Sequence, residues 1–187
     1  GTRKTSHADT SAVTTFATGL PQRIPGFHVG GAMDVEFLHG KAYVLVSLVG
    51  EDVGGTAVVG IYRMDGPKRF TPVGDIGAFS LANPPSTDFF VPTGVQYAME
   101  RYGNGFLVTD GHHNRVLRVT RDGDVSELIT FGNIVPTGLA LVGGLVFMAE
   151  AGPVPHLPEN GKVIAFGPWQ HFVWEVAPGA PLLVDVE

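Results

Sequence analysis

The sequence predicts an all-β protein built from β-propeller blades, and three observations support this fold class. Hydrophobic residues make up 44% of the 187 residues and charged residues only 16%, with 26 glycines and 14 prolines. Many turn-forming residues combined with few charges favour strands over helices. No window of eleven or more residues has the 3.6-residue apolar period of an amphipathic helix. The third observation is an internal repeat.

Two stretches of the chain start with the same four residues, Val-Pro-Thr-Gly, at positions 91 and 135. Each continues with an apolar strand, a glycine-marked turn and a second strand, and third strands follow at 114–119 and 161–166. Four strands in about 40–50 residues are the pattern of a propeller blade; a β-sandwich with fortuitous similarity is the alternative. We expect Thr93 and Thr137 to hold equivalent places at the start of innermost strands. There, proline fixes φ and glycine lets backbones approach closely.

An earlier, looser copy of the pattern completes three blades, at about 31–80, 91–131 and 135–178. Residues 12–20 resemble the outer strand of a further blade, and residues 183–187 resemble a first strand. We therefore expect an N-terminal tail at 1–11 and one partial propeller domain at 12–187. Closed propellers have about four to eight blades, so three blades with flanking strands predict an incomplete ring.

The segment TDGHHNRVLRVTRDGDVSELITFG resembles the NHL repeat, with Asn114, Arg115, Asp122 and Gly123 in the places of its motif. The wider layout resembles the ScyD/ScyE-type propellers. This resemblance is carried by Pro136-Thr137-Gly138, by Ala149-Glu150 and by the proline-rich segment GPVPHLPENG. It implies a six-bladed ring when completed, and a protein that is exported or periplasmic and whose biochemical role is unassigned. The N-terminal residues lack the apolar segment of a signal peptide.

Charge and composition argue against several functions. The net charge is −6 and no basic cluster is longer than Arg3-Lys4, whereas nucleic-acid binding needs a concentrated basic surface. No apolar run approaches the roughly 18 residues of a transmembrane helix. The absence of cysteine removes thiol nucleophiles, disulfides and Cys-type zinc sites. The chain also lacks a Gly-x-Ser-x-Gly elbow, a His-Glu-x-x-His zinc motif and a glycine-rich nucleotide loop.

In a blade, the segments before the first strand and the loops between the second and third strands share one face. Ser47, Asp110 and Glu150 end second strands, and four histidines share this face. Asp110, Glu150 and His28 are candidate ligands for a divalent ion, calcium or magnesium. The alternative is that each acid accepts hydrogen bonds from its own turn. Candidates for contacting a ligand on this face are Thr93, Thr137, His112 and His113. For the two adjacent histidines, the alternative is an exposed hairpin tip.

These features favour a non-enzymatic β-propeller that binds an unknown ligand or acts in assembly. The alternative is a metal-dependent hydrolase or lyase of the lactonase type. Lactonase-type propellers hold a central metal with ligands at strand starts, where this chain has Asp34, Gly94 and Gly138, so one ligand of three is present. We also expect a second polypeptide, or a second copy of the chain, to complete the ring, because an open arc exposes apolar faces and strand edges.

Overall fold

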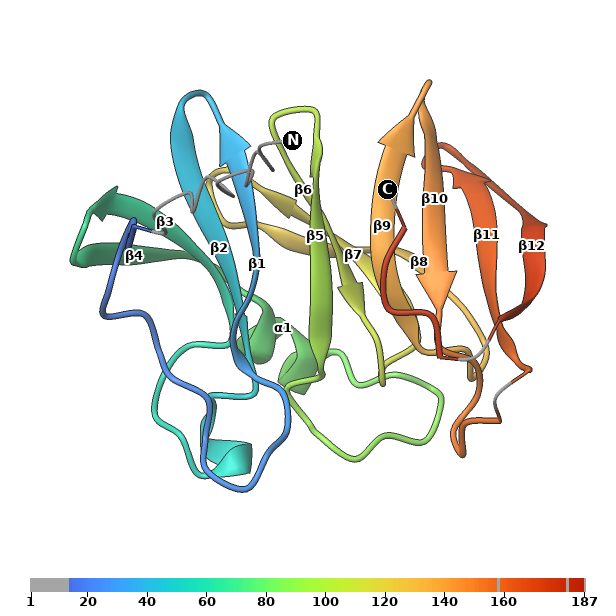
Figure 1. The fold of residues 1–187 in the computed structure, drawn as a ribbon, viewed down its shortest axis with the longest axis horizontal. Coiled ribbons are helices and arrows are strands. Elements are labelled where there is room, and N and C mark those ends of the chain that lie inside the picture. The colour runs from blue at the N-terminus through green and yellow to red at the C-terminus, as the bar shows by residue number, and fades with distance from the viewer. Residues whose placement is uncertain (1–13, 158, 181, 187) are drawn as a thin grey trace, which may run out of the picture.

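The computed structural model describes residues 14–157, 159–180 and 182–186, and in these residues the protein is all-β, as predicted (Figure 1). Its strands form three antiparallel four-stranded sheets, named here A, B and C. Sheet A holds β1 (Gly31–Leu38), β2 (Lys41–Ser47), β3 (Gly60–Gly66) and β4 (Arg69–Asp75). Sheet B holds β5 (Gln96–Tyr102), β6 (Gly105–Asp110), β7 (Arg115–Thr120) and β8 (Val125–Thr130). Sheet C holds β9 (Pro136–Val142), β10 (Leu145–Glu150), β11 (Gly161–Gly167) and β12 (Gln170–Ala180).

Each sheet is a simple meander in which consecutive strands pair with one another. Tight turns between the first two strands make this possible: Leu38 pairs with Lys41, Tyr102 with Gly105, and Val142 with Leu145. Positive φ angles in these turns explain their glycines, for example +60° at Gly143 and +84° at Gly144.

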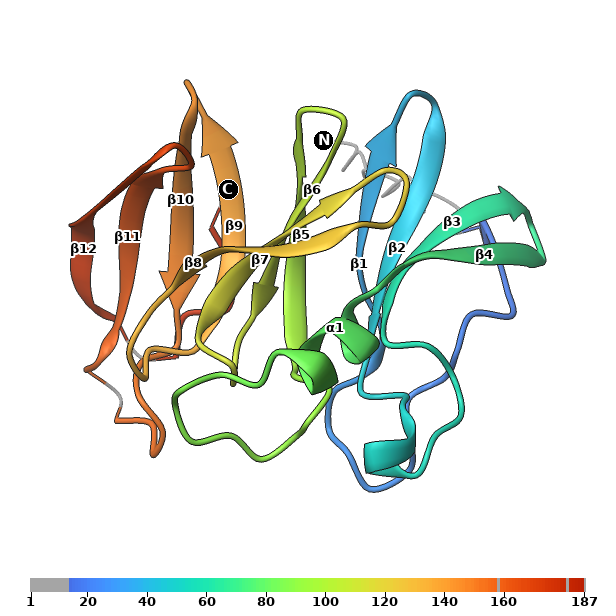
Figure 2. The same ribbon diagram turned by 180° about the vertical axis from the view of Figure 1, so that it is seen from behind.

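The three sheets pack face to face, and both packing layers are apolar. The layer between sheets A and B includes Tyr43 and Leu45 on one side and Phe106 and Val108 on the other. The layer between sheets B and C places Leu107 and Val116 against residues of β9, β10 and β11. Because successive strand residues point to opposite faces, Phe106 and Leu107 pack in different layers. The first strands of the sheets are neighbours, with β5 in contact with both β1 and β9 (Figures 1 and 2).

One seven-residue helix, α1 (Ile76–Ala82), connects sheet A towards sheet B, and a 3-10 turn, η1 (Glu51–Val53), lies between β2 and β3. The Asp75 side chain caps α1 by accepting a hydrogen bond from the amide of Ala78 at 2.8 Å. The sequence did not predict this helix because it is shorter than the window in which helical periodicity can be recognised. No helix within the described part of the chain has the length and apolarity to cross a membrane.

The two flanking strands expected at 12–20 and 183–187 are not strands where the structure describes them. Residues 12, 13 and 187 lie outside the described residues, while 14–20 and 183–186 run alongside the sheets without forming a ladder. The amide of Thr18 donates to the carbonyl of Pro67 at 2.9 Å, and Leu20 packs against sheet A. The carbonyl of Leu183 accepts from Thr137 Oγ1 at 2.9 Å, beside β9. One isolated hydrogen bond holds a segment but does not define a strand.

The expected equivalence of Thr93 and Thr137 is also wrong. The amide of Gly111 donates to the carbonyl of Val95, and the amide of Ala151 donates to the carbonyl of Val135. These matching bonds join residues whose numbers differ by 40, not by the 44 that separate the two Val-Pro-Thr-Gly motifs. One motif therefore precedes β5, whereas the other lies at the start of β9. The same four residues occur in two different structural settings.

Candidate functional site

The most concentrated group of buried polar side chains lies where β6 ends and β7 begins. Asp110 and Arg115 are directly opposite each other in this antiparallel pair, so their side chains lie on the same face. Arg115 Nε donates to Asp110 Oδ2 at 2.9 Å, and the two side chains are 1% and 0% exposed. A buried charge pair of this kind survives only where further hydrogen bonds satisfy its remaining donors and acceptors.

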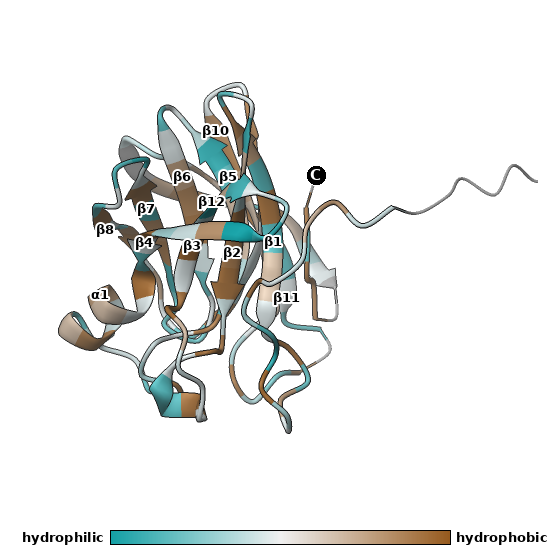
Figure 3. Cartoon of the chain, turned by 90° about the vertical axis from the view of Figure 1, so that its left-hand side faces the viewer, coloured by the Kyte–Doolittle hydropathy of each residue, from teal (hydrophilic) through white to brown (hydrophobic). Residues whose placement is uncertain are grey.

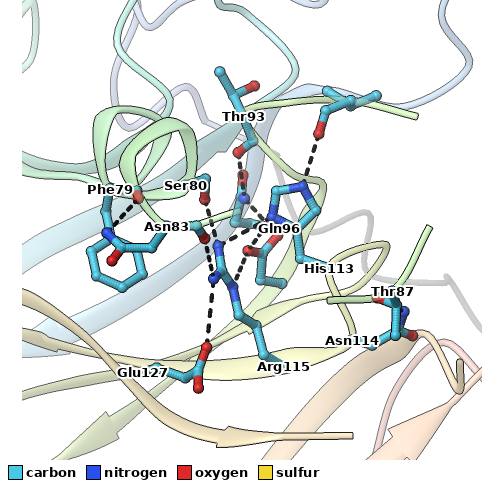
Figure 4. A network of polar contacts seen from close by, with 12 residues as sticks. Phe79, Ser80, Asn83, Thr87, Thr93, Gln96, His113, Asn114, Arg115 and Glu127 are labelled. Atoms are coloured by element: carbon cyan, nitrogen blue, oxygen red, sulfur yellow. Dashed lines mark hydrogen bonds and ion pairs between the residues drawn. The ribbon is translucent and has the colours of Figure 1, made fainter. Parts of the chain in front are cut away.

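Segments from outside sheet B supply those hydrogen bonds to Arg115 (Figure 4). Its Nη1 donates to the carbonyl of Asn83 at 2.8 Å, and its Nη2 donates to Ser80 Oγ at 3.0 Å. The guanidinium also lies 5.3 Å from the ring centroid of Phe79, within range of a cation–π interaction. Glu127 adds a second carboxylate at 3.6 Å. Arg115 thereby joins β7 to the end of α1.

His113 belongs to the same group and has both ring nitrogens engaged. Its Nε2 lies 2.9 Å from the carbonyl oxygen of Val91, which can only accept a hydrogen bond, so Nε2 carries the hydrogen. Its Nδ1 lies 3.1 Å from both Arg115 Nη2 and Asp110 Oδ2. With the hydrogen on Nε2, this nitrogen accepts from Arg115 Nη2. The imidazole therefore connects the segment before β5 to the buried pair.

Gln96, the first residue of β5, extends the group to sheet A. Its side-chain amide Nε2 lies 3.0 Å from both Asp110 Oδ1 and the carbonyl of Thr93. The main-chain N–H of Gln96 donates to Ser47 Oγ at 3.0 Å, and the Ser47 hydroxyl donates to the side-chain oxygen Oε1 of Gln96 at 2.8 Å. Each Asp110 oxygen thus has a donor, and hydrogen bonds run from β2 through β5 and β6 to β7.

Glycine is required at position 94 because this group is packed tightly. A Cβ added there would lie 2.1 Å from Asp110 Oδ1 and 2.5 Å from Gln96 Nε2, and the residue has a φ of +79°. At this glycine the close neighbours are side chains; the predicted close approach of backbone is found at Gly138, where a Cβ would lie 2.5 Å from Asp185 Cα. Thr93, beside Gly94, is anchored separately, since its amide and hydroxyl both donate to Asp52 Oδ2, at 2.9 and 2.8 Å.

Glu150 occupies the place in sheet C that Asp110 occupies in sheet B, but its surroundings differ. It is 1% exposed, its Oε1 lies 3.9 Å from Lys162 Nζ, and its Oε2 has no hydrogen-bond partner among the described residues. Pro136 lies opposite Glu150 where Gln96 lies opposite Asp110, and proline offers no donor. Burial therefore raises the pKa of Glu150 from 4.5 to about 7, with Lys162 opposing the rise and Glu175 adding to it.

The other histidines of the predicted face are separate from the Asp110 group. His112 is half-buried, and burial lowers its pKa. It lines an apolar cavity of about 200 Å³ together with Phe27, Phe90, Tyr97 and four other residues. His28 is exposed. Thr137 lies elsewhere, beside β10, with its hydroxyl 3.0 Å from the carbonyl of Ala149.

The predicted metal ligands Asp110, Glu150 and His28 do not come together. Over residues 14–157, 159–180 and 182–186, no group of three or more histidine, aspartate or glutamate side chains is placed to hold a metal ion. A cavity of about 470 Å³ lies between η1 and α1 and is lined in part by Glu51, Asp52 and Asp75. Sequence reasoning did not single out Gln96 or Ser80. The five-residue spacing of Asp110 and Arg115 around a turn was a usable signal for their pairing.

Chemically, the Asp110 group joins β5, β6 and β7 to one another, to β2 and to the end of α1, and its polar atoms are already engaged. Ser80 Oγ accepts from Arg115 and Ser47 Oγ donates to Gln96. Within the described residues, neither hydroxyl is bonded to a histidine, as a serine nucleophile requires. No protein-family model matches the chain, and no curated protein matches its sequence.

Proposed function

We propose that this chain is part of a β-propeller and that it serves as a non-enzymatic scaffold for binding or assembly. The four-stranded antiparallel meanders, their face-to-face packing and the contacts between their first strands support a blade arrangement. The resemblance to NHL repeats and ScyD/ScyE-type propellers adds the expectations of a six-bladed ring and of an exported or periplasmic protein. A fold by itself implies no activity, so the function depends on the side chains.

One observation carries the proposal: the side chains with catalytic chemistry are used in buried hydrogen bonds that join the strands of sheet B to one another and to neighbouring segments. Asp110, Arg115, His113 and Gln96 are buried and bonded to one another or to main-chain carbonyls. A general base or nucleophile needs an atom that a substrate can reach. In this group, such an atom would become available only if one of these hydrogen bonds were broken.

The test is elemental analysis of the purified protein, followed by turnover assays on a panel of lactones and esters. We expect no stoichiometric divalent metal and no turnover above background. Glu150→Gln is the informative variant, with Glu175→Gln as its control, because both acids lie near Lys162 and only Glu150 is buried. Turnover that Glu150→Gln abolishes and Glu175→Gln preserves would contradict the scaffold proposal.

A metal-dependent hydrolase or lyase is the second candidate, and the Glu150 oxygen that lacks a partner among the described residues favours it. A buried carboxylate without a donor suits a calcium or magnesium ion, which binds oxygen ligands. In this alternative, one tightly held ion would be lost from Glu150→Gln and retained by Glu175→Gln.

The scaffold proposal also includes a partner. Within the described part of the chain, sheets A and C each have one face that no other sheet covers. A second polypeptide or a second copy of the chain would cover these faces.

A further inference from the structure

The sheets of this chain pack in one repeated manner. We call the face that a sheet turns to the next sheet along the chain its forward face, and the opposite face its back face. The forward face of one sheet packs against the back face of the next. The forward face of sheet A, including Tyr43 and Leu45, meets the back face of sheet B, including Phe106 and Val108. The forward face of sheet B, including Leu107, then meets the back face of sheet C. Two faces are left over: the back face of sheet A and the forward face of sheet C.

The back face of sheet A is apolar. Val35, Val44 and Tyr62 lie directly opposite one another across β1, β2 and β3. Phe37, two residues after Val35 on the same face of β1, is 55% exposed. Part of the face is covered by Leu20, and a groove of about 440 Å³ remains beside this segment, lined in part by Val35 and Val44. Figure 3 views the molecule from this side, where apolar residues colour much of β2 brown.

The forward face of sheet C is apolar as well. Ala140, Phe147, Ala165 and Trp174 lie opposite one another across β9, β10, β11 and β12. Phe172 follows the same alternation, and its ring centroid lies 5.9 Å from that of Trp174. Phe172 is 70% exposed, so a large aromatic surface remains in contact with solvent.

We propose that the forward face of sheet C docks on the back face of sheet A in a second copy of this chain, and that the second copy returns the same contact. This proposal rests on the scaffold function proposed above. Its occupant is specified by the chain itself, because these two faces are the halves of a contact that the chain makes twice internally. Two copies related by a two-fold axis would bury both pairs of faces in one closed particle. Phe37 and Phe172, now exposed, would then be buried in the two contacts.

The test uses Phe37→Lys and Phe172→Glu in the full chain, with Leu81→Lys as the control. Leu81 is 60% exposed on α1, which belongs to neither sheet A nor sheet C. Mass is measured by light scattering and sedimentation over a concentration series. We expect the unaltered protein and the control to have twice the 19.8 kDa chain mass. Each face variant alone should associate roughly 100-fold more weakly, because every contact then buries one charge against an apolar face.

Mixing the two face variants decides which faces meet. In a mixed pair, one contact is unaltered and the other carries both introduced charges, which have opposite signs, so dimers should reappear. Association that fails in one variant only would indicate like-with-like docking and overturn the proposal. A monomeric unaltered protein, growth beyond two copies, or no recovery on mixing would overturn it too. None of these results bears on turnover or bound metal, so the scaffold proposal is judged separately.

Discussion

Replacing Glu150 by glutamine should remove a pH-dependent loss of stability from this protein. The carboxyl is buried, one of its oxygens lacks a partner among the described residues, and its pKa is about 7 in the folded chain against an ordinary value of 4.5. The folded protein therefore binds more protons than the unfolded chain between these two values. This group's contribution to the free energy of unfolding is complete below pH 4.5 and is lost as the pH rises through 7.

The size of the effect follows from that difference in pKa. Each pKa unit corresponds to about 1.4 kcal/mol, so the rise from 4.5 to about 7 gives about 3 kcal/mol. Glutamine resembles the protonated acid and cannot ionise. Glu150→Gln should therefore be similar to the unaltered protein near pH 4 and more stable near pH 8. For a chain of this length, the gain at the higher pH is about 6–12 °C in Tm.

The assay is urea unfolding of the two proteins at intervals between about pH 4 and about pH 8. Other titrating groups contribute equally to both proteins, so the difference between the curves isolates Glu150. A useful companion is Glu175→Gln. Glu175 lies 3.3 Å from Lys162 and raises the pKa of Glu150. Replacing it by glutamine should therefore lower the pKa of Glu150, so that the pH-dependent loss of stability begins at a lower pH. Parallel stability curves for Glu150→Gln and the unaltered protein would refute the reasoning.

Two further substitutions test the buried group in sheet B, both by urea unfolding at neutral pH. Arg115→Met leaves the buried Asp110 carboxylate without its cation and should lower the free energy of unfolding by about 3–5 kcal/mol. Adding Asp110→Asn should recover part of this loss. Equal losses in the single and double variants would contradict the pairing. Gly94→Ala should cost several kcal/mol, because its Cβ would overlap Asp110 Oδ1. Gly103→Ala is the control, since it also has a positive φ but open space around it, and should cost about 1 kcal/mol. Equal losses at the two glycines would show that φ alone matters.

The strand pattern was predictable because it depends on local alternation. Third strands were expected at 114–119 and 161–166, and the structure places β7 at Arg115–Thr120 and β11 at Gly161–Gly167. The flanking segments were not predictable in the same way. A segment such as 14–20 becomes a strand only where a neighbouring strand offers hydrogen-bonding partners, and that depends on tertiary structure.

Strand register was the second limit. The Val-Pro-Thr-Gly motif occurs twice, yet the backbone bonds at Val95 and Val135 set the alignment of the sheets four residues away from the motif alignment. Packing of whole hairpins decides register, and a four-residue motif contributes little to it. Gln96 was missed for the same reason. Its link from Ser47 to Asp110 spans two sheets, and nothing in the sequence near residue 96 indicates such a contact.

The contrast between Asp110 and Glu150 shows what sequence position alone leaves open. Both acids end a second strand, and both face a basic residue at the start of the third, Arg115 or Lys162. Asp110 has Gln96 opposite and an arginine whose other donors are held by α1 and the residue after it, so both oxygens are bonded. Glu150 has Pro136 opposite and a lysine that lies closer to the carboxylate of Glu175, so one oxygen has no donor within the described residues. The same strand-end position therefore holds a fully hydrogen-bonded carboxylate in sheet B and a carboxyl group with a raised pKa in sheet C. The residues that surround the two acids, more than the acids themselves, determine that difference.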